Sequence, residues 1–415
     1  MSKRANWSEE QRANENRVRN ELRASRARAR RPDLPPYTPR APRGPSTKPA
    51  IPEGHELAGV STLTDPDGNV KAEWAKTRVH GADSPPVAIP EGHLVKSTSV
   101  MQRGDGTTSV QWTKYAADEK AREDAMHAAW ARHAAQYAGL AGTSPPPTHA
   151  TTDLLCTVYP LGDPHVGMLA WGPETGTHYD LTIATRELMA CMRELVESAP
   201  ASERAIIVNL GDFLHAQDDA NMTPGHGNKL DVDGRFAKVL DAGHALLRGM
   251  VDAALAKHRH VTVRNLPGNH DPRVAAELAM WLRAVYEKEP RVTVADAFRS
   301  HQYDEFGANL LGWHHGDRTP GKELPAIMAV DQCEAWGRTR FHVWHTGHVH
   351  HESAKEYPGC DVESHGILPP GDAWHAGRYR SRRRMSAITI HREFGEIARA
   401  SVGIERVHAA LRAQG

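Results

Sequence analysis

The sequence predicts an α/β fold for the second half of this chain, and two observations carry that prediction. Short apolar runs rich in Val, Ile and Leu alternate with longer segments in which apolar residues recur every three to four positions. The short runs are typical of buried strands and the longer segments of amphipathic helices. Five of the short runs also end in a polar motif, and loops that leave strand ends in an α/β fold meet at one edge of a sheet.

The elements can be assigned in order along the chain. Strands are predicted over 154–161, 205–210, 261–266, 309–313 and 341–346. One helix is indicated by the apolar face of Leu181, Leu188, Met192, Leu195 and Val196. A second is indicated by Phe236, Val239, Leu240, Leu246, Leu247, Met250, Val251 and Leu255, with Asp233 as its expected N-cap. A third helix is predicted over 116–138, which is rich in Ala, Glu, Lys and Arg.

The five polar motifs that follow the strands contain the side chains of a two-metal site. They are Asp163-Pro164-His165, Gly211-Asp212, Gly268-Asn269-His270-Asp271, His315-Gly316 and Gly347-His348-Val349-His350. Carboxylate, imidazole and amide oxygen suit Mn²⁺, Fe²⁺ or Zn²⁺. An Asp that bridges two ions holds them about 3.5–4 Å apart, and a neighbouring His can protonate a leaving alkoxide. Each motif alone also fits an ordinary turn or loop, so the prediction depends on the ordered set.

The ordered set resembles the calcineurin-like metallophosphoesterase superfamily over residues 154–391. The resemblance implies a sandwich of two mixed β-sheets flanked by helices. It also implies that one metal is bound by Asp163, His165, Asp212 and His350, and a second by Asp212, Asn269, His315 and His348, with Asp212 bridging. His270 would be the catalytic histidine, oriented by Asp271. His315 is preferred over the adjacent His314 because His315 precedes Gly316, as the family pattern requires.

The residues around the motifs narrow the range of possible substrates. The run after Gly211-Asp212 lacks the second Asp, the Arg and the Gly of phosphoprotein phosphatases, whereas His215 resembles the DNA-repair exonuclease branch. We therefore expect His215 either to support a metal ligand from behind or to position substrate, the alternative being a histidine with no role in turnover. The polar loop 216–235, including Arg235, is the first candidate substrate-binding segment. The second contains Trp374, His375 and Arg378, since phosphates attract Arg and bases stack on Trp. Both segments also fit solvated surface.

The first 150 residues have a different composition from the rest. Residues 1–50 hold 13 Lys and Arg against 5 Asp and Glu and are rich in Pro, so we expect a disordered basic arm. This arm would either contact nucleic acid or have no function. Residues 51–115 contain an internal repeat, in which Ile51-Pro52-Glu53-Gly54-His55 recurs 38 residues later from Ile89. Each unit predicts a β-hairpin that could pack on a second copy or a protein partner. A connecting helix and Pro-rich linker occupy 116–150, and the catalytic domain 151–415.

Composition sets the outer limits of the function. The chain is formally neutral, its polar N-terminal residues do not resemble a signal peptide, and we expect no membrane span because no apolar run reaches the required length. Its 4 cysteines lack metal-binding or disulfide spacing, so we expect a cytoplasmic protein. If the chain is phage-encoded, as similar repeated hairpins in tailed-phage proteins indicate, the compartment would be the host cytoplasm.

These observations predict a dinuclear-metal-dependent phosphodiesterase that hydrolyses DNA with a metal-bridging hydroxide. Two divalent ions are expected, Mn²⁺ first, with Fe²⁺ or Zn²⁺ as alternatives. One alternative function is a phosphoesterase for nucleotides, cyclic nucleotides or phosphomonoesters. The other, from a different class, is a nucleic-acid-binding or phage assembly protein.

Overall fold

The computed structural model describes residues 55–64, 70–79, 93–102, 108–372 and 382–414. The chain divides into two compact units, with the boundary between Asp118 and Glu119. The units are described separately below.

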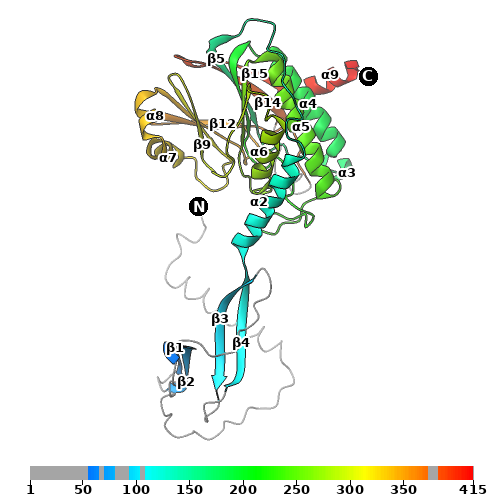
Figure 1. Ribbon diagram of the computed structural model, residues 1–415. Coiled ribbons are helices and arrows are strands. Elements are labelled where there is room, and N and C mark those ends of the chain that lie inside the picture. The colour runs from blue at the N-terminus through cyan, green and yellow to red at the C-terminus, as the bar shows by residue number, and fades with distance from the viewer. Residues whose placement is uncertain (1–54, 65–69, 80–92, 103–107, 373–381, 415) are drawn as a thin grey trace, which may run out of the picture. The chain divides into compact units, whose positions relative to one another are not determined.

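The first unit contains two antiparallel β-hairpins (Figure 1). One pairs β1 (His55–Thr64) with β2 (Val70–Val79), and the other pairs β3 (His93–Gln102) with β4 (Thr108–Ala117). All four strands begin and end at positions related by the 38-residue offset of the sequence repeat. The equivalence extends to the register, because both hairpins have a bulge two residues into the first strand, between Leu57 and Gly59 and between Val95 and Ser97.

The second unit is built on two mixed β-sheets, as predicted. The larger sheet has the strand order β15-β14-β5-β6-β7-β8. Its strands β5, β6, β7 and β8 run parallel, while β14 and β15 are antiparallel additions at one edge. The bounds are β5 Thr152–Leu161, β6 Ser202–Asn209, β7 His260–Asn265, β8 Val292–Val294, β14 Arg384–His391 and β15 Gly395–Gly403.

The smaller sheet has the order β12-β13-β11-β10-β9. Its central strands β13, β11 and β10 are parallel, and both edge strands are antiparallel to their neighbours. The bounds are β9 Gln302–Phe306, β10 Asn309–His314, β11 Phe341–Thr346, β12 Ser353–Tyr357 and β13 Cys360–Ser364.

Helices cover the outer face of each sheet (Figure 1). The larger sheet packs against α4 (Leu181–Ser198), α5 (Phe236–Lys257), α6 (Val274–Val285) and α9 (Ile404–Gln414), while α2 (Glu119–Ala135) packs on α6. The smaller sheet is covered by α7 (Leu324–Asp331) and α8 (Cys333–Arg338). The short helix α3 (Gly172–Thr175) precedes α4. A separate apolar core lies between the sheets, where Val158 and Leu210 of one sheet meet Trp313 of the other.

The predicted N-cap of α5 is wrong. This helix begins at Phe236, whose backbone N–H donates to Asp219 Oδ1 over 2.9 Å. Asp233 instead accepts from the backbone N–H of Leu181, the first residue of α4, over 2.9 Å. Asp180 is the N-cap of α4 and accepts from Ile183 over 2.7 Å. The loop before α5 therefore also stabilises the start of α4.

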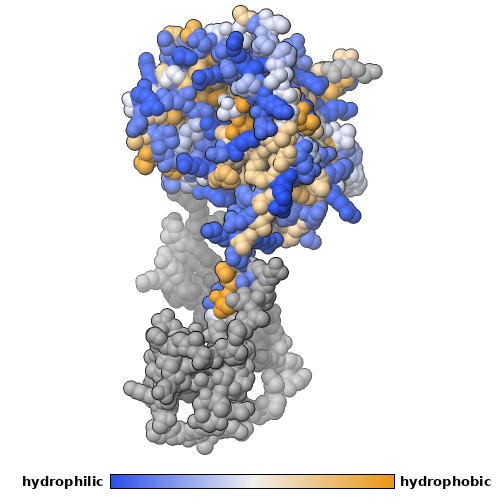
Figure 2. Space-filling model, viewed as in Figure 1, coloured by the Kyte–Doolittle hydropathy of each residue, from blue (hydrophilic) through white to orange (hydrophobic). Residues whose placement is uncertain are grey.

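The surface of the second unit is largely hydrophilic on the face seen in Figure 2. Among the described residues, no helix is both long enough and apolar enough to cross a membrane. All 4 cysteines are free thiols, and only Cys333 is exposed.

Candidate active site

All five polar motifs follow strands whose parallel neighbours bring their carboxyl ends to the same edge of a sheet. The first three motifs follow β5, β6 and β7 of the larger sheet, and the last two follow β10 and β11 of the smaller one. Because the two sheets face each other across one core, the five loops meet in one cleft.

These loops have an unusual backbone. Six described residues other than glycine have a left-handed φ, and five of them belong to the motifs: Asp163, His165, Asp212, His348 and His350. Their φ values lie between 39° and 67°. This conformation costs an L-residue of order 1–3 kcal/mol and persists where the surrounding structure imposes it, often at functional sites. This backbone conformation therefore lowers the stability of the fold while it sets the directions of these side chains.

Asp163, His165 and His350 form the first group of side chains. His350 Nε2 lies 2.9 Å from Asp163 Oδ2 and 3.3 Å from His165 Nε2. Asp163 is fully buried and also accepts from the backbone N–H of His348 over 2.9 Å. Burial is the largest single influence and would lower the pKa of His350, but the hydrogen bond to Asp163 and the charges of Asp163, Asp212 and Asp372 together raise this pKa.

Asp212, His315 and His348 form the second group, with Asn269 beside it. His315 Nε2 lies 3.4 Å from Asp212 Oδ2 and 3.0 Å from Asn269 Oδ1. His315 Nδ1 donates to the carbonyl of Leu210 over 2.9 Å. Because a carbonyl only accepts, this contact keeps a proton on Nδ1 and directs Nε2 toward the carboxylate, as is usual for a metal-binding histidine.

The charges of the second group are strongly coupled. Burial would lower the pKa of His315, but the carboxylates of Asp212 and Asp163 raise it to about 10. Burial opposes ionisation of Asp212 as well, yet the neighbouring His315 holds the pKa of this carboxyl well below its usual range. The protonated imidazole of His315 therefore supplies a positive charge beside the Asp212 carboxylate, as a bound metal ion would.

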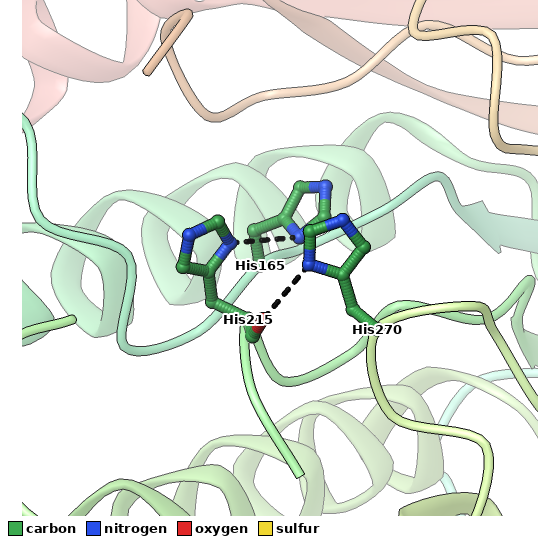
Figure 3. Close-up of side chains that lie close together, drawn as sticks. All are labelled: His165, His215 and His270. Carbon is green, nitrogen blue, oxygen red and sulfur yellow. Dashed lines mark hydrogen bonds between the residues drawn. The ribbon is translucent and has the colours of Figure 1, made fainter. Parts of the chain in front are cut away.

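His270 lies beside both groups, and Figure 3 shows its ring next to those of His165 and His215. The rings of His270 and His165 are 4.8 Å apart. His270 Nδ1 donates to the carbonyl of His215 over 2.8 Å, which leaves Nε2 for other partners. The backbone N–H of His270 donates to Asp212 Oδ1 over 2.8 Å, so this histidine and the Asp212 carboxylate are positioned together.

The structure does not place Asp271 where it could orient His270. Asp271 is buried beneath the loop, and its Oδ2 accepts from the backbone N–H of Leu214 over 2.8 Å. Burial, followed by repulsion from Asp212, raises the pKa of Asp271 to about 8. The contact that orients the ring of His270 comes from the carbonyl of His215 instead.

His215 lies behind the cleft rather than in it. Its Nδ1 is 3.3 Å from His165 Nδ1, and its side chain is 1% exposed (Figure 3). Burial, followed by the influence of His270, lowers the pKa of His215 to about 3, so the ring is neutral. A neutral His215 can accept the Nδ1 proton of His165 and leave His165 Nε2 free to bind an ion. His215 therefore contacts a candidate metal ligand from behind and does not itself line the cleft.

The structure also separates His314 from His315. His314 Nδ1 accepts from the backbone N–H of Gly316 over 2.8 Å, and its ring stacks on His301 with 4.6 Å between centroids. Only His315 of this pair reaches the second group.

Two glycines allow the loops to approach each other closely. A Cβ on Gly268 would overlap the backbone nitrogen and the carboxylate of Asp212, and a Cβ on Gly347 would overlap Asp163 Oδ1. The Gly residues of the third and fifth motifs are therefore required by packing against the carboxylates.

The two groups face a cleft of about 760 Å³. His165, Asp212, Asn269, His270, His348 and His350 line its floor. The lining also includes residues of the segment from Thr223 to Leu230, among them His226 and Lys229, and it includes Asp317 and Arg318. Ile367, Pro370 and Asp372 also line the cleft.

Of the predicted substrate-binding residues, Arg235 is the one that lies among the described residues. Arg235 is exposed immediately before α5 and does not line the cleft, because the chain has already turned away toward the helix. Trp374, His375 and Arg378 lie outside the described residues. Lys229 and Arg318 are the basic residues that the structure brings to the cleft. The signal for Arg318 was present in the sequence, since it follows the fourth motif by two residues.

Comparisons with known proteins give distant structural similarity only. Neither a protein-family model nor a curated protein matches the chain. A predicted phosphoesterase of Streptococcus pneumoniae is 11% identical, with a TM-score of 0.24, and the match covers 61% of this chain and 99% of that one. The phosphoesterase Yfce of E. coli is 14% identical, with a TM-score of 0.30 and coverage of 59% and 98%. Vps29 of Entamoeba histolytica, solved with zinc, is 12% identical, with a TM-score of 0.24 and coverage of 60% and 99%. An assignment of activity must therefore rest on the cleft itself.

Proposed function

We propose that this chain is a dinuclear-metal-dependent phosphodiesterase and that its substrate is DNA. The observation that carries the proposal is the pair of side-chain groups at the floor of one cleft. Asp163, His165 and His350 form one group, and Asp212, His315 and His348 form the other, with His270 beside both.

The residues present fit two divalent ions. Each group offers one carboxylate and two imidazoles whose ligand atoms lie within 4.8 Å of one another. Asn269 adds an amide oxygen to the second group, and Asp212 lies where it could serve both. This donor set suits Mn²⁺, Fe²⁺ or Zn²⁺. When bound, two such ions supply Lewis-acid stabilisation of a phosphoryl group and an activated water.

The protein itself supplies the proton. His270 Nδ1 is committed to the His215 carbonyl, so Nε2 is the atom that can exchange a proton with a bound ester. In its protonated form, His270 can donate that proton to the leaving oxygen. The Asp212 carboxylate holds the backbone N–H of this histidine and the His215 carbonyl holds its ring, which limits its motion during transfer.

Two features support a nucleic-acid substrate. Lys229 and Arg318 both line the cleft and could contact backbone phosphates near the scissile bond. The loop after Gly211-Asp212 also lacks the acidic and basic residues of phosphoprotein phosphatases.

One observation favours a small substrate as the second candidate. The cleft volume of about 760 Å³ falls within the range of small-molecule sites. A nucleotide or a cyclic nucleotide would fill it, with Lys229 or Arg318 binding a terminal phosphate.

A substrate panel tests the proposal. The purified chain with Mn²⁺ should cleave single- or double-stranded DNA, and Asp212→Ala should lower the rate by at least about 10³-fold because the shared carboxylate is lost. If the chain hydrolyses a chromogenic phosphomonoester but leaves DNA uncleaved, the small-substrate alternative would be established instead. Full DNA cleavage by Asp212→Ala would refute the metal assignment. Binding of DNA without any hydrolysis would favour the binding or assembly class.

A further inference from the structure

Away from the cleft, a second set of metal-competent side chains lies between the sheets. His345 of β11 pairs in register with Glu363 of β13, and His365 follows two residues later. Because side chains alternate along a strand, Glu363 and His365 lie on the same face. Topology therefore brings together a His and a Glu-x-His pattern that are separated in sequence.

The ligand atoms have the spacing of a metal site. His345 Nδ1 is 3.0 Å from His365 Nε2 and 3.7 Å from Glu363 Oε2. A tetrahedral Zn²⁺ with Zn–N bonds of about 2.0–2.1 Å separates its ligand atoms by about 3.3 Å. The two observed distances lie on either side of that value. The ring of Trp313 stacks on His345 at 5.0 Å and 20°, which fixes the imidazole plane.

The environment of the group favours a cation. His345 is 2% exposed and His365 4% exposed, and burial lowers the pKa of both imidazoles, so they are neutral. Arg399 binds both oxygens of Glu363 and also pairs with Glu396. The two carboxylates and one guanidinium leave one negative charge uncompensated. A carboxylate oxygen has a further lone pair, so Glu363 can serve Arg399 and an ion together.

We propose that His345, Glu363 and His365 bind a third divalent metal ion, of the Zn²⁺ class, with a structural role. Two imidazoles and a carboxylate are typical zinc ligands, whereas Mg²⁺ and Ca²⁺ prefer oxygen alone. The ion would tie β11 to β13 at the end of the strands that lead into the cleft.

The location explains why such an ion would matter for the active site. Only Thr346 and Gly347 separate His345 from His348 of the second group. The backbone N–H of His365 donates to the Thr346 carbonyl over 2.8 Å. The residue after His365, Gly366, packs closely on Gly162: a Cβ added to Gly162 would lie 2.5 Å from the Gly366 carbonyl oxygen. The proposed ion therefore supports the loops that carry His348 and Asp163.

Zinc content tests this proposal without reference to activity. The full chain is loaded with Zn²⁺, unbound metal is removed by gel filtration, and the bound zinc is measured by inductively coupled plasma mass spectrometry. His365→Gln should hold about one equivalent less than the wild type. His342→Gln is the matched control, since His342 lies on the same strand but hydrogen-bonds to the Gly359 carbonyl and belongs to none of the metal-competent groups.

The outcomes separate this proposal from the function proposed above. If the cleft binds no metal, the wild type would hold one equivalent, and His365→Gln would lose it. If the third site is absent, His365→Gln and His342→Gln would hold equal zinc, which overturns the proposal. Crystals of the wild-type chain grown with zinc provide a test that needs no variant. Anomalous density between the rings of His345 and His365 is expected, and its absence would also overturn the proposal.

Discussion

At the scale of single residues, the cleft is held in a conformation that ordinary side chains avoid. The left-handed φ of Asp163, Asp212 and His348 would cost the fold several kcal/mol in total if the surrounding contacts did not compensate for it. Part of the compensation is visible: Asp163 accepts from the His348 backbone, and Asp212 accepts from the His270 backbone. The two carboxylates thus organise the loops as well as offering ligand atoms.

The raised pKa of His315 predicts that metal binding releases protons. In the metal-free protein, His315 remains charged up to a pH of about 10, whereas an ion requires the neutral ring. Metal affinity should therefore rise as pH increases toward 10. Calorimetric titration at pH 7.5 in buffers of different ionisation enthalpy should show release of about one proton or more per chain.

The sign of the linked stability effect is opposite. The folded pKa of His315 lies above the unfolded value of 6.5, so its stabilising charge is fully present below pH 6.5 and is lost as pH rises through about 10.

Asp212→Asn is the control for proton release, because removing that charge should lower the pKa of His315 and the number of protons released. A wild-type enthalpy that is independent of buffer would contradict the coupling.

At the scale of elements, the turn over residues 221–230 brings residues between Thr223 and Leu230 to the lining of the cleft. A backbone bridge pairs Met222 with Lys229, and the backbone N–H of Asn228 donates to Thr223 Oγ1 over 3.0 Å. Asn221, the sixth residue with a left-handed φ, begins this turn. The turn places Lys229 beside the metal-competent residues, although its side chain is exposed.

The position of Lys229 in the cleft lining predicts that the effect of Lys229→Ala depends on the substrate. If Lys229 contacts a DNA phosphate, its loss should weaken DNA binding for all sequences and reduce the slope of log affinity against log salt by about one. Hydrolysis of a small diester should change little. Filter binding across a salt series and steady-state kinetics on both substrates provide the measurements.

Arg235→Ala is the matched control, because it removes the same charge from a residue a few positions away that does not line the cleft. We expect unchanged DNA affinity. If Arg235→Ala had the larger effect, the sequence-based assignment would be preferred over the cleft lining seen here.

The helix caps show why element ends were harder to predict than element centres. The apolar periodicity correctly predicted α4 and α5, since it follows from the burial of one helical face. The caps depend on which loop oxygen reaches which free N–H. Asp233 was therefore assigned to the nearer helix, whereas it accepts from α4, and Asp219 reaches α5 across a loop.

At the scale of the whole molecule, the division after Asp118 predicts that the cleft does not require the N-terminal unit. A fragment of residues 119–415 should fold and retain the small-diesterase activity of the full chain, because it contains both mixed sheets and every metal-competent group found among the described residues. Circular dichroism and kinetics would check this. We expect the full chain to bind DNA more tightly at low salt, since residues 1–50 are basic.

An insoluble or inactive fragment would show that the units depend on each other for folding. Equal DNA affinity of the fragment and the full chain would remove the proposed role of the basic arm, while leaving the catalytic proposal intact.

The sequence by itself determined the α/β class and the residues of the two groups at the cleft. It could do so because strand periodicity is local, and because parallel strands necessarily bring the loops at their carboxyl ends to one edge. Only the tertiary structure decided contacts between side chains on separate elements. It placed His215 behind His165, gave the orientation of His270 to a carbonyl rather than to Asp271, and brought Lys229 and Arg318 into the lining of one cleft. It also joined His345 to Glu363 and His365. Such contacts depend on how the sheets and loops pack, and no local pattern in the chain specifies that packing.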